Sequence, residues 1–116
     1  MHLGEMEQMV LLAVLQVGDD AYGGAVGKEL ESRTGRTVSR GALYVTIDRL
    51  ENKGMLSTTL GESTPGRGGR RKRHLEVTPA GVAALRAARR NWMSLWAGLD
   101  DAPPEGRKVF LGTAGR

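Results

Sequence analysis

A chain of 116 residues, 40% of them hydrophobic, has the length of one domain with a single modest core. It contains no cysteine, which excludes disulfides and thiolate metal sites, and its longest apolar run, Met9 to Leu15, is too short to cross a membrane. The N-terminus also lacks the features of a signal peptide. We therefore expect a cytoplasmic protein without membrane contact.

The net charge of +4 is distributed unevenly along the chain. Residues 1–32 carry one cation and six acids, whereas residues 33–93 carry thirteen cations and four acids. The charges of residues 94–116 cancel. A basic middle segment beside an acidic N-terminal segment is typical of a protein with one nucleic-acid-binding face.

Apolar residues recur at helical spacing between Met6 and Val17 and predict a first helix. Its apolar side is wide, because Leu11, Leu12 and Leu15 add to it. We therefore expect burial on two sides, one against its own domain and the other against a partner subunit. The helix ends at Gly18-Asp19-Asp20.

A second helix is indicated by Tyr22, Val26 and Leu30, which lie four residues apart, and it ends at Gly35. Glycine lowers the stability of a helix, and this segment contains three. Either two helices pack closely here or the helix begins later. The three glycines are Gly23, Gly24 and Gly27.

Residues 36–38 are predicted to form a short extended piece, and Ser39 to be the N-cap of a third helix that ends at Gly54. The periodicity predicts an inner face of Leu43, Ile47 and Leu50. Other residues of this helix are free to contact a partner. Gly41, Val45 and Asn52 lie on the opposite face, Asp48 and Arg49 flank them, and Arg40 and Tyr44 lie near the N-terminal end.

Residues 55–60 and 70–77 have the pattern of two strands, with residues 61–69 as the tip between them. The tip and the start of the second strand carry five cations among glycines. Like charges at close range repel one another unless water or a polyanion surrounds them, so a solvated basic loop and a nucleic-acid-binding hairpin both stay open on this segment alone. The cations are Arg67, Arg70, Arg71, Lys72 and Arg73.

Thr78 as N-cap and Pro79 at the first helical position begin a fourth helix, predicted over residues 79–99. It carries a short heptad stripe of apolar residues. So small a domain has nothing left to cover this stripe, so we expect a homodimer. Residues 100–116 form a tail to which we assign no role. The predicted interface residues are Leu85, Ala88, Trp92, Leu95, Trp96 and Leu99.

This order of elements is typical of a winged helix-turn-helix, in which the third helix enters the major groove and the hairpin lies along the backbone or minor groove. We predict a mainly α fold with a small β-hairpin: a winged helix-turn-helix domain over residues 1–78, then the dimerisation helix. Arginine can pair bidentately with guanine, and a tyrosine hydroxyl can reach phosphate. The candidate residues for binding double-stranded DNA are Ser39, Arg40, Tyr44, Arg49 and the five hairpin cations.

Three motifs of the chain match a known family. They are Ser39-x-Gly41-x-Leu43-Tyr44-x-x-Ile47-x-Arg49-Leu50-Glu51-x-x-Gly54, Gly69-Arg70-Arg71-Lys72-Arg73 and Val77-Thr78-x-x-Gly81. With them the chain resembles the PadR family of bacterial transcriptional regulators over residues 6–98. The resemblance implies a DNA-binding repressor that dimerises through its fourth helix. The family usually has two tyrosines where this chain has His74 and Leu75, which puts a DNA contact at those positions in doubt.

Several of these residues have a second interpretation. Arg49 and Glu51 could tie the third helix to its neighbours, and Tyr44 could pack on the hairpin. Trp92 and Trp96 are either packing anchors of the dimer or, as in multidrug-sensing relatives, a stacking site for a small aromatic effector.

No pattern points to an enzyme. His2 and His74 lack partners at ligand spacing, and the glycines of residues 66–69 lack the lysine-serine pair and the helix of a phosphate-binding loop. We therefore expect no catalytic residue, metal or cofactor. The alternative function is a winged-helix protein-interaction module without DNA binding, but such a module has no need of five hairpin cations.

Overall fold

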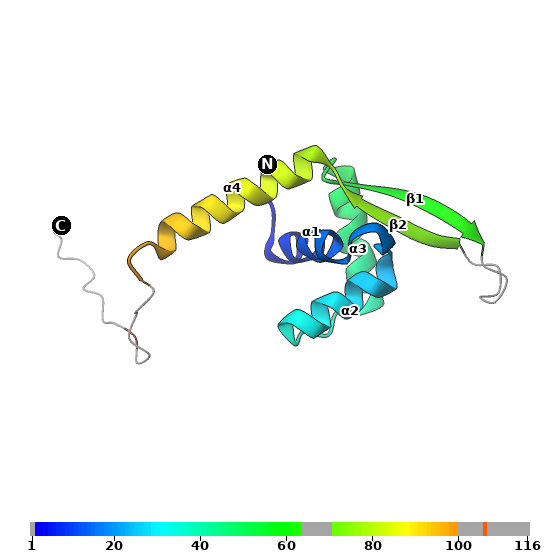
Figure 1. The fold of residues 1–116 in the computed structure, drawn as a ribbon, viewed down its shortest axis with the longest axis horizontal. Coiled ribbons are helices and arrows are strands. Elements are labelled where there is room, and N and C mark those ends of the chain that lie inside the picture. Colours follow the sequence, from blue (N-terminus) through cyan, green and yellow to red (C-terminus); the bar gives the residue numbers. More distant parts are fainter. Residues whose placement is uncertain (1, 64–70, 100–105, 107–116) are drawn as a thin grey trace.

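The computed structural model describes residues 2–63, 71–99 and 106, with residues 62, 63, 71 and 72 described by their backbone alone. The predicted fold class is confirmed, since the chain is mainly helical with one two-stranded antiparallel sheet (Figure 1). No helix in these ranges is long and apolar enough to cross a membrane. The elements are α1 (Glu5–Val17), the 3-10 turn η1 (Gly18–Asp20), α2 (Gly23–Thr34), α3 (Arg40–Asn52), β1 (Leu56–Ser63), β2 (Arg71–Val77) and α4 (Pro79–Trp96).

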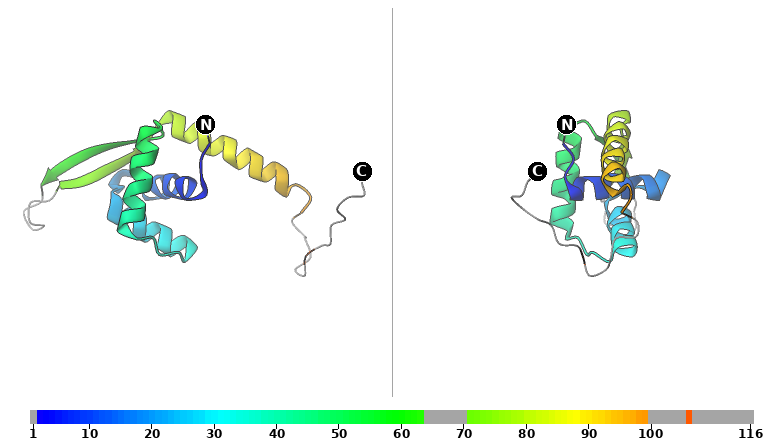
Figure 2. Two further views of the ribbon diagram at one scale, coloured as in Figure 1. Left: turned by 180° about the vertical axis from the view of Figure 1, so that it is seen from behind. Right: turned by 90° about the vertical axis from the view of Figure 1, so that its left-hand side faces the viewer.

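Three helices form the body of the molecule, and two elements project from it. The hairpin of β1 and β2 extends to one side of α1, α2 and α3, while α4 passes over α1 and continues on the opposite side (Figure 1). The two further views show α3 standing across α1 and α2 beside the base of the hairpin (Figure 2). The predicted DNA-reading helix and the hairpin therefore lie next to each other.

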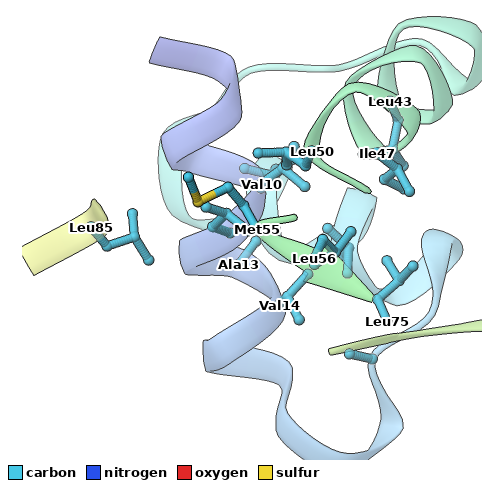
Figure 3. Packing of buried hydrophobic residues seen from close by; sticks show 14 of the residues in the cluster. Val10, Ala13, Val14, Leu43, Ile47, Leu50, Met55, Leu56, Leu75 and Leu85 are labelled. Atoms are coloured by element: carbon cyan, nitrogen blue, oxygen red, sulfur yellow. The ribbon is translucent and has the colours of Figure 1, made fainter. Parts of the chain in front are cut away.

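The core lies where α1, α2, α3 and the base of the hairpin meet (Figure 3). Leu11, Ile47 and Leu56 are among its fully buried side chains. The predicted inner face of α3 is confirmed, because Leu43, Ile47 and Leu50 are all buried. Thr46 is buried with them, and its hydroxyl donates a hydrogen bond to the carbonyl of Ala42 at 2.9 Å, so a polar side chain fits this face without an unpaired hydroxyl.

The hairpin is longer than the sequence pattern indicated. β1 continues to Ser63, where residues 61–63 were expected in the tip, and an irregularity of register lies between the pairs Leu60↔Arg73 and Ser63↔Arg71. Pairing with β2 holds these residues in the strand although their polar, glycine-containing sequence has low strand propensity. Closer to the body, Thr58 pairs with Leu75 and Leu56 with Val77.

Residues 36–38 form no strand, which corrects the expected short extended piece. Side chains of this connection and of α2 hold it instead: the Thr37 hydroxyl donates to Glu31 at 2.9 Å, and the Arg36 amide donates to the hydroxyl of Thr34 at 3.1 Å. The segment that pairs with β2 in addition to β1 lies just before α2. A single bridge joins Tyr22 to His74, and the Leu75 amide donates to the Ala21 carbonyl at 2.8 Å.

The glycines of α2 lie in a region of close helix packing. A Cβ atom on Gly23 would lie 2.2 Å from the hydroxyl oxygen of Tyr44, whereas one on Gly24 would meet nothing within 4 Å. α2 begins at Gly23, with Tyr22 as its N-cap. Of the two explanations left open by the sequence, close packing therefore applies, and at Gly23.

The start of α4 is anchored to the turn between α3 and β1. Thr78 is the N-cap as predicted, since its hydroxyl accepts from the amide of Gly81 at 3.1 Å. The same hydroxyl donates to the carbonyl of Gly54 at 2.7 Å, and the Thr78 amide donates to the carbonyl of Met55 at 3.1 Å. This joint sets the direction in which α4 leaves the body.

The helical stripe on α4 is shorter than predicted at both ends. Leu85 is only 8% exposed, because its side chain packs toward α1 in the core of its own chain (Figure 3). At the other end, α4 stops at Trp96, not at Leu99, since Ala97 leaves the helical conformation and Gly98 has a positive φ of 79°. Leu99 therefore follows the helix, and its amide donates to the Trp96 carbonyl at 2.8 Å.

Candidate nucleic-acid interface

The outer face of α3 is exposed. Ser39 caps the helix, because its hydroxyl accepts from the amide of Ala42 at 3.1 Å. A hydroxyl that accepts keeps its own O–H donor, so the predicted DNA contact of Ser39 stays a prediction. The remaining outer residues give the helix a mixed surface. Gly41, Val45, Asp48, Arg49 and Asn52 are all exposed.

The N-terminal end of α3 faces the beginning of α2 across a cavity of about 230 Å³. Arg40 is exposed at its edge, and Lys28 of α2, which the sequence did not single out, lies on the opposite wall. Tyr44 is half-buried, with its hydroxyl against Gly23, so the ring packs on α2. Two cations, the Tyr44 side chain and the carboxylate of Glu31 thus line this open cavity.

The hairpin, which is the wing of this fold, is tied to α3 by Arg73. Its Nη2 atom donates to Asp48 at 2.8 Å and to Glu51 at 3.0 Å, and the Thr58 hydroxyl donates to the other oxygen of Glu51 at 2.7 Å. The hydrogen bond to Asp48 raises the pKa of Arg73; desolvation opposes this, and the negative charges of both acids add to it. Because two acids pair with it, Arg73 orients the wing against α3. Its predicted contact with DNA stays a prediction.

Four further cations belong to the predicted wing. Arg71 and Lys72 lie at the outer end of β2, and Arg67 and Arg70 lie outside the described residues. Their predicted contacts with DNA stay predictions. Of the two positions where the wing lacks tyrosines, Leu75 is buried in the core and His74 is exposed.

Arg49 is exposed and lies toward the end of α3 that is tied to α1. There Lys53 donates to the carboxyl of Glu7 at 2.8 Å and to the carbonyl of His2 at 3.0 Å. Glu7 is 6% exposed, and its second oxygen lies 2.7 Å from the Lys53 ammonium without hydrogen-bond geometry, so that contact is an ion pair only. Burial raises the pKa of Glu7, but the hydrogen bonds from Lys53 and from the Gly4 amide, with the charges of Lys53 and Arg49, outweigh it and lower the pKa.

A second exposed surface is apolar and lies on α1 and α4. An open groove of about 540 Å³ runs between the two helices, with Leu12, Leu15, Trp92 and Met93 among the residues that line it. Ala88, predicted at the interface, is half-buried. We call the exposed large hydrophobic residues here the α1–α4 surface: Leu12, Leu15, Trp92, Met93, Leu95, Trp96 and Leu99.

Within the described ranges, no group of three or more histidine, aspartate or glutamate side chains is arranged to hold a metal ion. Asp48 and Glu51 of α3 are paired with Arg73. The chemistry that this surface supports is binding of a polyanion through cations and hydrogen-bond donors.

Comparison with known families decides the relationship of the chain. The sequence profile of the transcriptional regulator PadR-like family matches residues 11–87. The chain belongs to this family. The resemblance read from the motifs is therefore confirmed, and the PadR-like family consists of transcriptional regulators, not of enzymes.

Solved structures agree with this assignment. A PadR family transcriptional regulator from Eggerthella lenta is 29% identical, with 82% of each chain covered and a TM-score of 0.61. A PadR-like transcriptional regulator from Bacillus cereus is 20% identical over 83% of this chain and 88% of that chain, with a TM-score of 0.65. A winged-helix DNA-binding protein from STIV is 19% identical over 82% of this chain and 95% of that chain, with a TM-score of 0.62. Comparison with curated protein sequences gave no match.

The predicted winged helix-turn-helix is thereby confirmed, and the chain is a PadR-like transcriptional regulator by family. Sequence reasoning missed Lys28 and the pairing of Arg73 with α3. The spacing of Asp48 and Glu51, one turn apart on a helix beside a basic hairpin, was the signal for the second.

Proposed function

We propose that this PadR-like chain is a homodimeric repressor that binds a pseudo-palindromic duplex, with each α3 in a major groove and each wing beside it. The observation that carries this proposal is the placement of the exposed face of α3 next to the wing, which Arg73 holds through Asp48 and Glu51. Residues 1–78 would bind DNA and α4 would join the subunits. A dimer on a promoter blocks polymerase by exclusion, and the cytoplasm stays the expected location.

The DNA-binding part is tested by salt dependence. Replacing Arg70, Arg71 and Lys72 by alanine should weaken binding to every duplex and reduce the slope of log affinity against log salt, by about 0.9 for each phosphate that is no longer neutralised. A control with the same change in charge replaces Arg107, Lys108 and Arg116 of the tail. If wing and tail variants behave alike, the wing is not a DNA element. If the unmodified protein binds no duplex at low salt, the alternative of a protein-interaction module takes its place.

The dimer is proposed from the α1–α4 surface. Trp92 and Leu95 are 56% and 69% exposed. They lie on α4, which extends past the other three helices (Figure 2). Apolar residues exposed together in this way mark an association surface. Replacing Trp92 and Leu95 by glutamate should give monomers in sedimentation velocity. The matched control replaces Ala83 and Ser94, on the opposite side of α4, by glutamate as well, and this variant should stay dimeric.

The proposal also includes a small aromatic effector that binds at the tryptophans of α4. Trp92 lines the groove between α1 and α4, and Trp96 is 54% exposed one turn further on. A flat, cationic compound could stack on either ring and would release DNA if it prefers a dimer geometry that does not fit the operator. Titration with an ethidium-type dye while following tryptophan fluorescence tests this. Saturable quenching that Trp92→Ala and Trp96→Ala each reduce supports the site, and no saturable quenching leaves a repressor without an effector.

A further inference from the structure

The proposed dimer does not account for every exposed hydrophobic residue. Of the nine exposed large hydrophobic side chains in the described residues, seven form the α1–α4 surface. The other two are Val45 in α3 and Leu60 in β1. Val45 is 55% exposed and lies on the helix whose other exposed side chains of comparable size are charged or polar. Val45 is therefore the only large apolar side chain of α3 that is exposed.

Val45 occupies the middle of the outer face of α3. Helical geometry places it opposite Leu43, Ile47 and Leu50, one turn after Gly41. A Cβ atom built on Gly41 would meet nothing within 4 Å, so the surface beside Val45 is open. Together Gly41, Ala42 and Val45 form a low apolar strip, over which another surface can approach α3 closely.

The charges around this strip indicate what approaches it. Arg40 and Arg49 are exposed on the same helix, and the nearest acid, Asp48, is paired with Arg73. Arg49 is thus an exposed cation beside the strip and Arg40 one at the N-terminal end of the helix, which favours a partner that combines negative charge with a small apolar group. The major groove of DNA has both, since phosphates line it and the 5-methyl group of thymine projects into it.

We propose that Val45 is a specificity-determining residue that packs against the 5-methyl group of a thymine in the operator. This inference rests on the proposed function and adds a base preference to it. Gly41 and Ala42 leave room for the methyl group beside Val45. Because the recognised group is the methyl and not a base-pairing edge, 5-methylcytosine at the same position is also accommodated, whereas uracil and cytosine leave Val45 without a partner.

The test begins with selection of the preferred duplex from random DNA. Each thymine is then replaced, one at a time, by deoxyuridine, which removes only the methyl group. At one position of each half-site, we expect this replacement to weaken binding by about fourfold. Burial of one methyl group changes affinity by about that factor. In the Val45→Ala variant this sensitivity should disappear. Leu60→Ala, which shortens an exposed hydrophobic side chain outside α3, should keep the pattern of the unmodified protein.

The outcomes separate the inference from the function on which it rests. If the protein binds a specific duplex but no deoxyuridine replacement weakens it, or if Val45→Ala keeps the same sensitivity, the inference is wrong and the proposed function stands. A selected half-site without thymine also overturns it. If no duplex is bound, both fail together. Because Val45 is exposed, Val45→Ala should fold normally, which circular dichroism checks.

Discussion

Gly81 lies in the first turn of α4, where this helix meets the rest of the winged-helix fold, and its replacement by alanine tests the packing there. A Cβ atom on Gly81 would lie 2.3 Å from the carbonyl oxygen of Met55 and 2.8 Å from Cγ1 of Val77. Real Cβ contacts are essentially never closer than 3.0 Å. The Met55 oxygen cannot move aside easily, because it belongs to the backbone and accepts a hydrogen bond from Thr78.

The expected free-energy change is the difference of two effects. Alanine in place of glycine within a helix stabilises the folded state by about 0.5–1 kcal/mol, whereas overpacking of a buried site costs about 1–3 kcal/mol. Since a backbone atom has to shift at Gly81, we expect a net loss of about 2 kcal/mol. The control is Gly24→Ala in α2, where the added methyl group meets nothing within 4 Å. That variant should gain about 0.5–1 kcal/mol.

Urea denaturation measures both variants. Comparison at one protomer concentration is necessary, because association adds to the apparent stability. A loss of about 2 kcal/mol lowers the midpoint by about 1 M if the slope is about 2 kcal/mol/M. A Gly81→Ala midpoint equal to or above that of the unmodified protein would refute the packing at the joint. If Gly24→Ala also loses stability, the glycines of this chain matter for a reason other than space.

Further predictions concern single side chains. Glu7→Gln should lower the free energy of unfolding at neutral pH. Because folding lowers the pKa of Glu7, the difference in unfolding free energy between the unmodified protein and this variant should shrink as the pH falls below the ordinary value of 4.5. Denaturation at a series of pH values measures this difference. Arg73→Gln should weaken operator binding without changing the salt slope; a slope reduced by about 0.9 would show a phosphate contact instead. Arg40→Ala should cost about 1–3 kcal/mol on the operator and little on random DNA in titrations, provided that Arg40 reads a base.

Local signals in the sequence were sufficient for much of the fold. Ser39 and Thr78 were predicted as N-caps because a hydroxyl one residue before a helix can accept from the amide three residues on, and both do so. The inner face of α3 followed from its period of 3.6 residues. Each of these signals lies within a few residues of the position that it predicts.

Contacts between distant segments could not be predicted in this way. Arg73 was predicted as a DNA contact because its neighbours are cations, but the fold brings Asp48, 25 residues earlier, within hydrogen-bond distance. Leu85 belonged to a heptad stripe in the sequence, and only the path of α4 over α1 shows that its own chain buries it. The tip of the wing at Arg67 and Arg70 lies outside the described residues.

The sequence by itself determined the order and type of the helices, the hairpin with its basic tip and the PadR-like motifs, because capping, periodicity and turn chemistry act over a few residues. The tertiary structure decided which side chains are left free on the surface. Burial and ion pairing depend on which segments meet in space, so Arg73 is paired and Leu85 is buried within the chain, while Val45, Trp92 and Leu95 stay exposed.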